Sequence, residues 1–154
     1  WIKLDDELKY KQLLNISKER ITMMTTEHPN ISLFNQLDPS NVGQSADIFS
    51  ENFIWHFFNP SIPQIEGDYV GIEGLQRFFE ILSAMTEGTF QVEPISVTPV
   101  GDELVIAHVK DRMTLKGNSI ELDAVVVWRV VDGLLAEAWD IPSVYNDSPQ
   151  PMAA

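Results

Sequence analysis

The stretch ELDAVVVWRVVDGLLAEAWDIP, residues 121–142, predicts a β-hairpin around which the rest of the chain is organised. Two apolar runs rich in Val, Leu and Trp flank Asp132 and Gly133, as expected of paired strands. Asp-Gly between such runs is typical of a two-residue type I′ turn, which needs positive φ at both positions. The second strand ends on Trp139 and Asp140, where an unpaired carboxylate is costly unless it faces a cavity or a partner. Asp140 is therefore the first candidate for a functional residue.

The composition indicates one acidic globular domain. The 154 residues are 44% hydrophobic and 21% charged, with a formal net charge of −13. This charge argues against nucleic acid and anionic membranes as partners, because both bind clustered Lys and Arg. The absence of cysteine excludes disulfides, thiolate metal sites and a cysteine nucleophile. The sequence has no apolar run long enough to span a membrane and no signal-peptide pattern, so we expect a cytoplasmic protein.

The first half of the chain predicts three helices and one strand. The expected elements are a helix at 5–25, a short helix that begins at Asp38 and Pro39, a strand at 53–58, a loop at 59–71 and a helix at 72–87. Val42, Ala46 and Phe49 form the expected inner stripe of the short helix. The loop contains two prolines and two glycines and is placed to cover the mouth of a pocket.

The second half predicts an antiparallel meander. Strands are expected at 89–99 and 103–115, followed by the two strands of the hairpin, with turns at 101–102, 116–118 and 132–133. Pro94 predicts an edge position or a bulge, because proline cannot donate to a sheet ladder. Strands of about thirteen residues would measure about 40 Å if straight, so the sheet must curl and enclose a cavity. Residues 146–154 are expected to form a flexible tail.

Three segments in this order carry a resemblance to a known family: FSENFIWHFFNP at 49–60, YVGIEGLQRFF at 69–79 and WRVVDGLLAEAWD at 128–140. The chain resembles the SnoaL-like, polyketide cyclase-like branch of the nuclear transport factor 2-like and ketosteroid isomerase-like superfamily. The resemblance covers 38–142 of a single domain at 1–145, with residues 1–37 as an N-terminal helix and connection. It implies an α+β fold in which a cone-shaped, curled antiparallel sheet, also described as cystatin-like, wraps around three N-terminal helices.

Alternation along the strands, with the register implied by similarity to the ketosteroid isomerases of the superfamily, assigns side chains to the two faces of the sheet. The resemblance implies a cavity lined by Ala107, Val109, Asp111 and Met113, by Ala124, Val126, Trp128 and Val130, by Ala136, Ala138 and Asp140, and by Trp55 and Phe57. It places on the convex face His108, Glu121, Asp123, Arg129 and Glu137. Relatives often dimerise through that face, so we expect a homodimer.

Asp140 and Asp111 are the main catalytic candidates. Burial raises the pKa of a carboxyl group, and two neighbouring carboxyls become one neutral donor and one ionised base, as acid/base catalysis requires. His56 is a third candidate because it titrates near neutral pH, although strict alternation places it outside unless a bulge redirects it. Alternatively, Asp140 pairs with a buried Arg112 or Arg77. Expected substrate-binding residues are Trp55, Phe57, Tyr69, Val109, Met113, Val126, Trp128 and Ala138.

Most catalytic residues of the superfamily's enzymes have no counterpart here. The base and acidic donor of ketosteroid isomerases match positions near Phe57 or Asn59 and Val126, none of which carries a carboxylate. The histidine of the polyketide cyclases would also lie near Val126, and only their strand-five aspartate is matched, by Asp140. The three histidines lack metal-ligand spacing and no dinucleotide or phosphate motif is present, so we expect neither metal nor cofactor.

Two classes of function therefore remain open. One is a cofactor-free isomerase, cyclase or hydratase that transfers protons at Asp140 on a small apolar carbonyl or polycyclic compound. The other is a non-catalytic module that binds a small hydrophobic molecule or serves a dimeric interaction. The position of Asp140 distinguishes them, because an open cavity with a second polar group nearby favours the enzyme.

Overall fold

The computed structural model describes residue 12 and residues 27–144. Its elements are α2 (Pro29–Phe34), the 3-10 helix η1 (Val42–Ile48), β1 (Phe49–Phe57), the 3-10 helix η2 (Pro63–Ile65), β2 (Gly67–Val70), α3 (Gly71–Met85), β3 (Gln91–Val100), β4 (Leu104–Leu115), β5 (Asn118–Val131) and β6 (Leu134–Pro142). Apart from Gln12, which is helical, the helix expected at 5–25 lies outside the described residues, as does the expected tail. No helix in the described part is long and apolar enough to cross a membrane.

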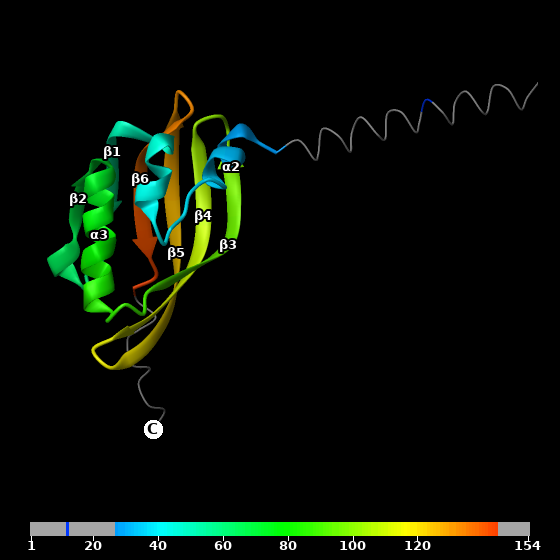
Figure 1. Ribbon diagram of the computed structural model, residues 1–154. Helices are drawn as coiled ribbons and strands as arrows, with labels where there is room; N and C mark the ends of the chain where they lie inside the picture. Colours follow the sequence, from blue (N-terminus) through cyan, green and yellow to red (C-terminus); the bar gives the residue numbers. More distant parts are fainter. Residues whose placement is uncertain (1–11, 13–26, 145–154) are drawn as a thin grey trace, which may run out of the picture.

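The strands form one six-stranded sheet in the order β2-β1-β6-β5-β4-β3. Neighbouring strands are antiparallel except for β1 and β6, which run parallel. Figure 1 shows α3 and α2 on the same side of the sheet and the long β4–β5 hairpin bending beneath them. The chain is therefore an α+β fold with a curled sheet, as expected from the strand lengths.

The predicted turn at Asp132 and Gly133 is confirmed, since their φ angles are 51° and 76°. The prediction for Pro94 is confirmed on both counts. β3 lies at the edge of the sheet, and its register with β4 shifts between Pro94 and Ser96. A bulge at an edge tolerates the missing proline N–H.

The loop expected at 59–71 is wrong in part, because it contains η2 and the strand β2. Tyr69 of β2 pairs with Trp55 of β1, and Asp68 pairs with His56. A strand of only four residues shows too little alternation to be recognised in the sequence. Strand pairing, rather than loop conformation, therefore positions Tyr69 and Asp68.

The first described helices also differ from the prediction. The helix expected after Asp38 is a 3-10 helix whose buried residues are Val42, Ser45 and Ile48, while Ala46 is exposed. A spacing of three matches the tighter turn of this helix type. Ser45 ties η1 to the segment that precedes it. Its Oγ donates a hydrogen bond to the Gln36 carbonyl at 2.9 Å and accepts one from the Asp38 amide at 3.1 Å.

Helix α2 begins at a proline, between the helices expected at 5–25 and after Asp38, where the sequence predicted no helix. Pro29 occupies the first position of the helix, where a missing N–H costs nothing. His28 precedes it and accepts a hydrogen bond from the Asn30 amide through Nδ1 at 3.2 Å. The proline therefore starts a helix here rather than preventing one.

The cavity-facing role expected for Ala136 is wrong because β6 has a bulge. Arg129 pairs with Glu137 whereas Val130 pairs with Leu135, which leaves Ala136 as an extra residue. Leu135 takes the inward position and is 0% exposed. An extra residue reverses the alternation on one side of a bulge, and only the positions after it keep the expected orientation.

Aromatic side chains hold α2 against the sheet and join β1 to β5 on its inner face. Trp128 of β5 contacts the rings of Phe34, Phe49, Phe53 and Trp55 at centroid separations of 5.2, 6.5, 6.1 and 5.5 Å. Such pairs contribute about 0.5–1.5 kcal/mol each beyond the area that they bury. The core is therefore densely aromatic where α2, β1 and β5 meet.

Candidate functional site

A cavity of about 150 Å³ lies between the inner face of the sheet and the helices. Seven aromatic residues line it: Phe34, Trp55, Phe57, Phe78, Phe79, Phe90 and Trp128. Four polar residues also line it: Asn59, Ser61, Asp111 and Asp140. An apolar cavity of about 150 Å³ stays dry and binds a molecule the size of benzene. The volume therefore suits a ligand of one or two rings.

Strand alternation positions both aspartates of the cavity. On β4, Ala107, Val109 and Asp111 all line the cavity, as expected from their spacing of two. On β6, Asp140 is paired with Val126 of β5 on one side and with Phe57 of β1 on the other. The sheet therefore brings carboxyl groups from two non-adjacent strands to one apolar space.

Both carboxyl groups are held in conditions that favour the neutral form. Asp111 is 9% exposed, and burial raises its pKa to about 7. Asp140 is partly buried, and burial, together with the charge of Asp111, raises its pKa to about 8. The Oδ1 atom of Asp111 is buried and has no hydrogen-bond partner among the described residues. Each carboxyl is thus suited to exchange protons near neutral pH.

Neither arginine considered as a partner reaches this cavity. Arg112 lies on the outer face, where its Nε is 2.8 Å from Glu121 and its Nη1 contacts Glu93. Arg77 is exposed, and its guanidinium lies 5.8 Å from the ring centroid of Tyr69. In the part of the chain that the structure describes, no Lys, Arg or His lines the cavity. The two carboxyl groups therefore have no counter-charge there.

Six of the eight expected substrate-binding residues line the cavity: Trp55, Phe57, Val109, Met113, Val126 and Trp128. Ala138 is fully buried between its strand neighbours Trp55 and Trp128, so it supports the wall without reaching it. Tyr69 packs against Phe78 and donates its hydroxyl proton to the Ile65 carbonyl at 2.6 Å. Its expected place in the cavity is therefore wrong, because β2 turns the phenol toward η2.

His56 lies on the outer face of the sheet, away from the two aspartates. Its Nδ1 is 2.6 Å from Asp68 and its Nε2 is 2.7 Å from Glu137, while its ring stacks on Trp139. From Ile54 to Phe57, β1 pairs with both neighbours in unbroken register. No bulge therefore turns this side chain inward, and His56 does not line the cavity that holds Asp111 and Asp140. His56 and Asp140 do both line a second pocket, on the outer face.

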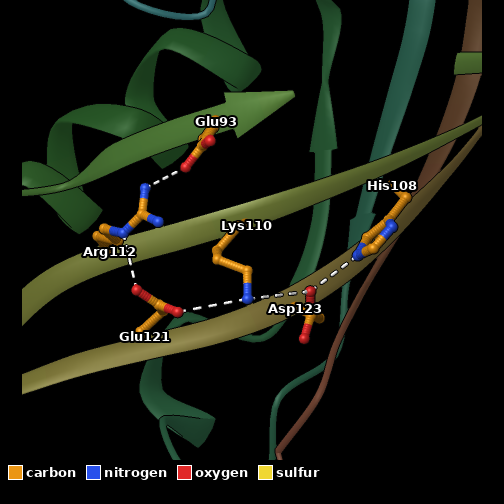
Figure 2. A network of polar contacts seen from close by, with 6 residues as sticks. All are labelled: Glu93, His108, Lys110, Arg112, Glu121 and Asp123. Carbon is orange, nitrogen blue, oxygen red and sulfur yellow. Dashed lines mark hydrogen bonds and ion pairs between the residues drawn. The ribbon is translucent and has the colours of Figure 1, made fainter. Parts of the chain in front are cut away.

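The outer face of β3, β4 and β5 carries the polar network in Figure 2. Its members are Glu93, His108, Lys110, Arg112, Glu121 and Asp123. Lys110 lies 3.3 Å from Glu121 and 3.8 Å from Asp123, and the His108 Nε2 lies 2.8 Å from Asp123. A hydrogen bond from Arg112 lowers the pKa of Glu121, and one from His108 lowers that of Asp123. The carboxylates of this network are paired and solvated.

Several polar features of the cavity were not predicted from the sequence. Asn59 and Ser61 come from the segment between β1 and η2, where no periodicity indicates which side chains face inward. The Nε1 atoms of Trp55 and Trp128 are buried without an acceptor among the described residues. Within the same residues, no group of three or more His, Cys, Asp or Glu side chains is placed to hold a metal ion.

The comparisons with known proteins agree with this architecture. The model of the SnoaL-like domain matches residues 32–138, so the chain belongs to the SnoaL-like family. Bal32a, from a soil-derived mobile gene cassette, is 20% identical, with a TM-score of 0.64 over 75% of this chain and 86% of its own. No curated protein matches the chain at a significant level.

Two other solved structures share the fold. TerC, co-crystallised with polyporic acid, is 20% identical, with a TM-score of 0.60 over 73% of this chain and 90% of its own. A Jannaschia sp. CCS1 protein assigned as a SnoaL-like polyketide cyclase is 14% identical, with a TM-score of 0.63 over 82% of this chain and 96% of its own. At these identities the likeness shows the fold alone, which is the nuclear transport factor 2-like α+β cone.

Proposed function

We propose that this protein is a cofactor-free enzyme that transfers protons on a small, mainly apolar carbonyl compound, as an isomerase, cyclase or hydratase. One observation carries the proposal: Asp111 and Asp140 share an apolar cavity without a counter-charge among the described residues, and both have raised pKa values. Groups with such pKa values are matched to acid/base work near neutral pH.

The proposed chemistry uses the two carboxyl groups in complementary states. Loss of one proton from the pair leaves one carboxylate, whose charge helps to keep the other carboxyl protonated. The carboxylate can accept a proton from a carbon next to the substrate carbonyl. The neutral carboxyl can then donate a hydrogen bond to the carbonyl oxygen as it gains negative charge. The apolar walls strengthen both interactions because they exclude water.

The cavity limits the size and polarity of the substrate. Its volume of about 150 Å³ suits one or two rings, and its many aromatic walls suit a flat apolar body. We also propose a cytoplasmic location, with which a sequence free of cysteine is compatible.

Deuterium exchange into 2-indanone, a compact aromatic ketone with acidic C–H groups beside its carbonyl, tests the proposal. We expect the protein to accelerate exchange in D₂O, followed by NMR, and Asp140→Asn to lose about 100-fold or more of this acceleration. Asp123→Asn is the matched control, because it removes a carboxylate from the outer face. Equal exchange by the parent and by Asp140→Asn would contradict the proposed role of Asp140.

Absence of catalysis would favour the second candidate function, a pocket that only binds a hydrophobic molecule. A specific observation supports this alternative: Val126 lines the cavity where the resemblance places catalytic groups of related enzymes. Binding of 2-indanone, measured by calorimetry, with no exchange above the buffer rate would identify such a pocket. A dimeric interaction role would instead leave the cavity without affinity for the ketone.

A further inference from the structure

We propose that the natural ligand of the cavity is an organic cation, a hydrophobic amine whose protonated nitrogen is neutralised by Asp111. The inference rests on the proposed function, because it names the substrate class of the same site and leaves proton transfer to Asp140.

The carboxyl group of Asp111 has no counter-charge in the cavity among the described residues. It is nine-tenths buried and lines the cavity, and its Oδ1 accepts no hydrogen bond from any residue that the structure describes. The positive side chains nearest in sequence, Lys110 and Arg112, point to the opposite face and are bound to outer carboxylates. A buried carboxyl without a counter-charge either keeps its proton or receives a cation from elsewhere. The open cavity beside Asp111 is where such a cation can enter.

The walls around the two carboxyl groups also favour a positive ligand. Aromatic rings present negative electrostatic potential on their faces, and a cation within about 6 Å of such a face gains about 0.5–2 kcal/mol. Trp55 and Trp128, whose rings lie 5.5 Å apart, both line the cavity. A carboxylate or phosphate on the ligand would instead meet two acids, with no base in the lining among the described residues. The aromatic rings and the two acids of the cavity therefore both favour a cationic ligand over an anionic one.

A cationic ligand would also adjust the second aspartate for catalysis. The charge of Asp111 is one of the two causes that raise the pKa of Asp140. The positive charge of an ammonium group bound to Asp111 offsets the negative charge of Asp111. The ionised form of Asp140 is then less disfavoured, so the pKa of Asp140 falls toward neutrality. Asp140 would then be ionised more often at neutral pH and would act as the base, while the bound ammonium group takes the place of the neutral carboxyl as the group that stabilises negative charge. A neutral ligand provides no such adjustment.

Three probes on one ring scaffold separate the possibilities: 2-aminoindane, 2-indanol and indane-2-carboxylate, which are a cation, a neutral molecule and an anion. We expect calorimetry at about pH 8 to show the amine binding about tenfold more tightly than the alcohol, and the carboxylate not at all. The affinity of the amine should rise from about pH 6 to about pH 8, because ionising the aspartates strengthens its binding. The affinity of the alcohol should not rise.

Variants assign the preference to one residue. Asp111→Asn should lose the tenfold preference for the amine and keep the affinity for the alcohol, whereas Asp123→Asn on the outer face should change neither. Retained binding of the alcohol shows that the cavity is still folded. Equal affinities of amine and alcohol in the parent protein, or no binding of the amine, would overturn the inference. So would an unchanged amine preference in Asp111→Asn.

These outcomes are distinct from failure of the proposed function. Binding of the amine and the alcohol requires no turnover, while deuterium exchange into 2-indanone requires Asp140 and no positive charge on the ligand. Exchange without amine preference would leave an enzyme for neutral carbonyl compounds. Amine preference without exchange would leave a binding protein for organic cations.

Discussion

Acidic side chains on the two faces of the sheet have pKa values shifted in opposite directions. On β4, Asp111 faces the cavity and its pKa is raised, while the adjacent Lys110 and Arg112 face outward and bind carboxylates. On β5, the outward Glu121 and Asp123 have lowered pKa values because Arg112 and His108 donate to them. A shift of one position along a strand thus decides whether an acidic side chain is a solvated partner or an unpaired buried acid.

We expect the outer face of the sheet to be the interface of a homodimer. Its side chains would then be exposed to solvent only in the monomer. We propose a homodimer, because Ile106, Val125 and Ile141 are 37%, 36% and 57% exposed and lie on neighbouring strands. His108 and Arg129 should then lie at or near the contact. Light scattering at tens of micromolar should give about twice the mass of one chain, and Val125→Glu should halve it. A monomeric parent protein at that concentration would rule the interface out.

The inner face makes an opposite prediction about stability. Because the pKa of Asp140 is about 8 when folded and 3.8 in an ordinary environment, the unfolded chain ionises first as pH rises. The parent protein should therefore lose stability between about pH 4 and about pH 8. Asp140→Asn cannot titrate, so we expect it to exceed the parent by about 5 kcal/mol in free energy of unfolding at pH 8 and to match it near pH 4.

Urea unfolding at the two pH values measures this difference. Asp123→Asn is the comparison, because its carboxylate has a lowered pKa and contributes stability above the unfolded pKa. It should therefore gain nothing at pH 8. A clear loss of stability in Asp140→Asn at pH 8 would mean that Asp140 is ionised and paired, contrary to the environment described here.

His56 provides the smallest predicted effect, with the opposite dependence on pH. Burial lowers the pKa of His56, but hydrogen bonds and charges of Glu137 and Asp68 outweigh it and raise the pKa above 6.5. Its contribution is complete below pH 6.5 and is lost as pH rises through the raised pKa. We expect the parent protein to lose about 1 kcal/mol by this route, and His56→Gln to lack the loss.

Thermal denaturation from about pH 6 to about pH 9 follows the His56 effect. Glu137→Gln keeps the histidine and removes one of its two carboxylate partners, so it should show a smaller loss than the parent protein. Identical profiles for the parent and His56→Gln would show that the contacts of His56 do not contribute to stability.

The sequence predicted the features of the fold that depend on residues close together in the chain. The turn at Asp132 and Gly133 and the bulge at Pro94 follow from local chemistry. The inward direction of Asp111 follows from a period of two together with the family resemblance, which indicates which face is inward. Features that depend on distant strands were missed. Tyr69 is directed by pairing with β1, and Ala136 is displaced by a bulge whose signal lies in the register with β5.

The candidate site was predictable to a similar extent. The two aspartates and most of the apolar lining could be placed from alternation and resemblance, because each lies in a long regular strand. The absence of a counter-charge could not, because Arg77 lies on a helix and only the structure shows that its side chain is exposed and does not line the cavity. The parallel pairing of β1 with β6 was also unforeseen, because it depends on strands far apart in the sequence.

The central position of β6 has a consequence for how the chain folds. Residues 134–142 lie between β1 and β5, so the last described strand joins two parts of the sheet made earlier during synthesis. Contacts between residues 49–57 and 134–142 close a long loop, which is an entropic cost that slows folding. Until β6 docks, β1 lacks one of its two strand neighbours. A ribosome-bound chain that stops short of Leu134 would therefore present an open β1 edge to chaperones.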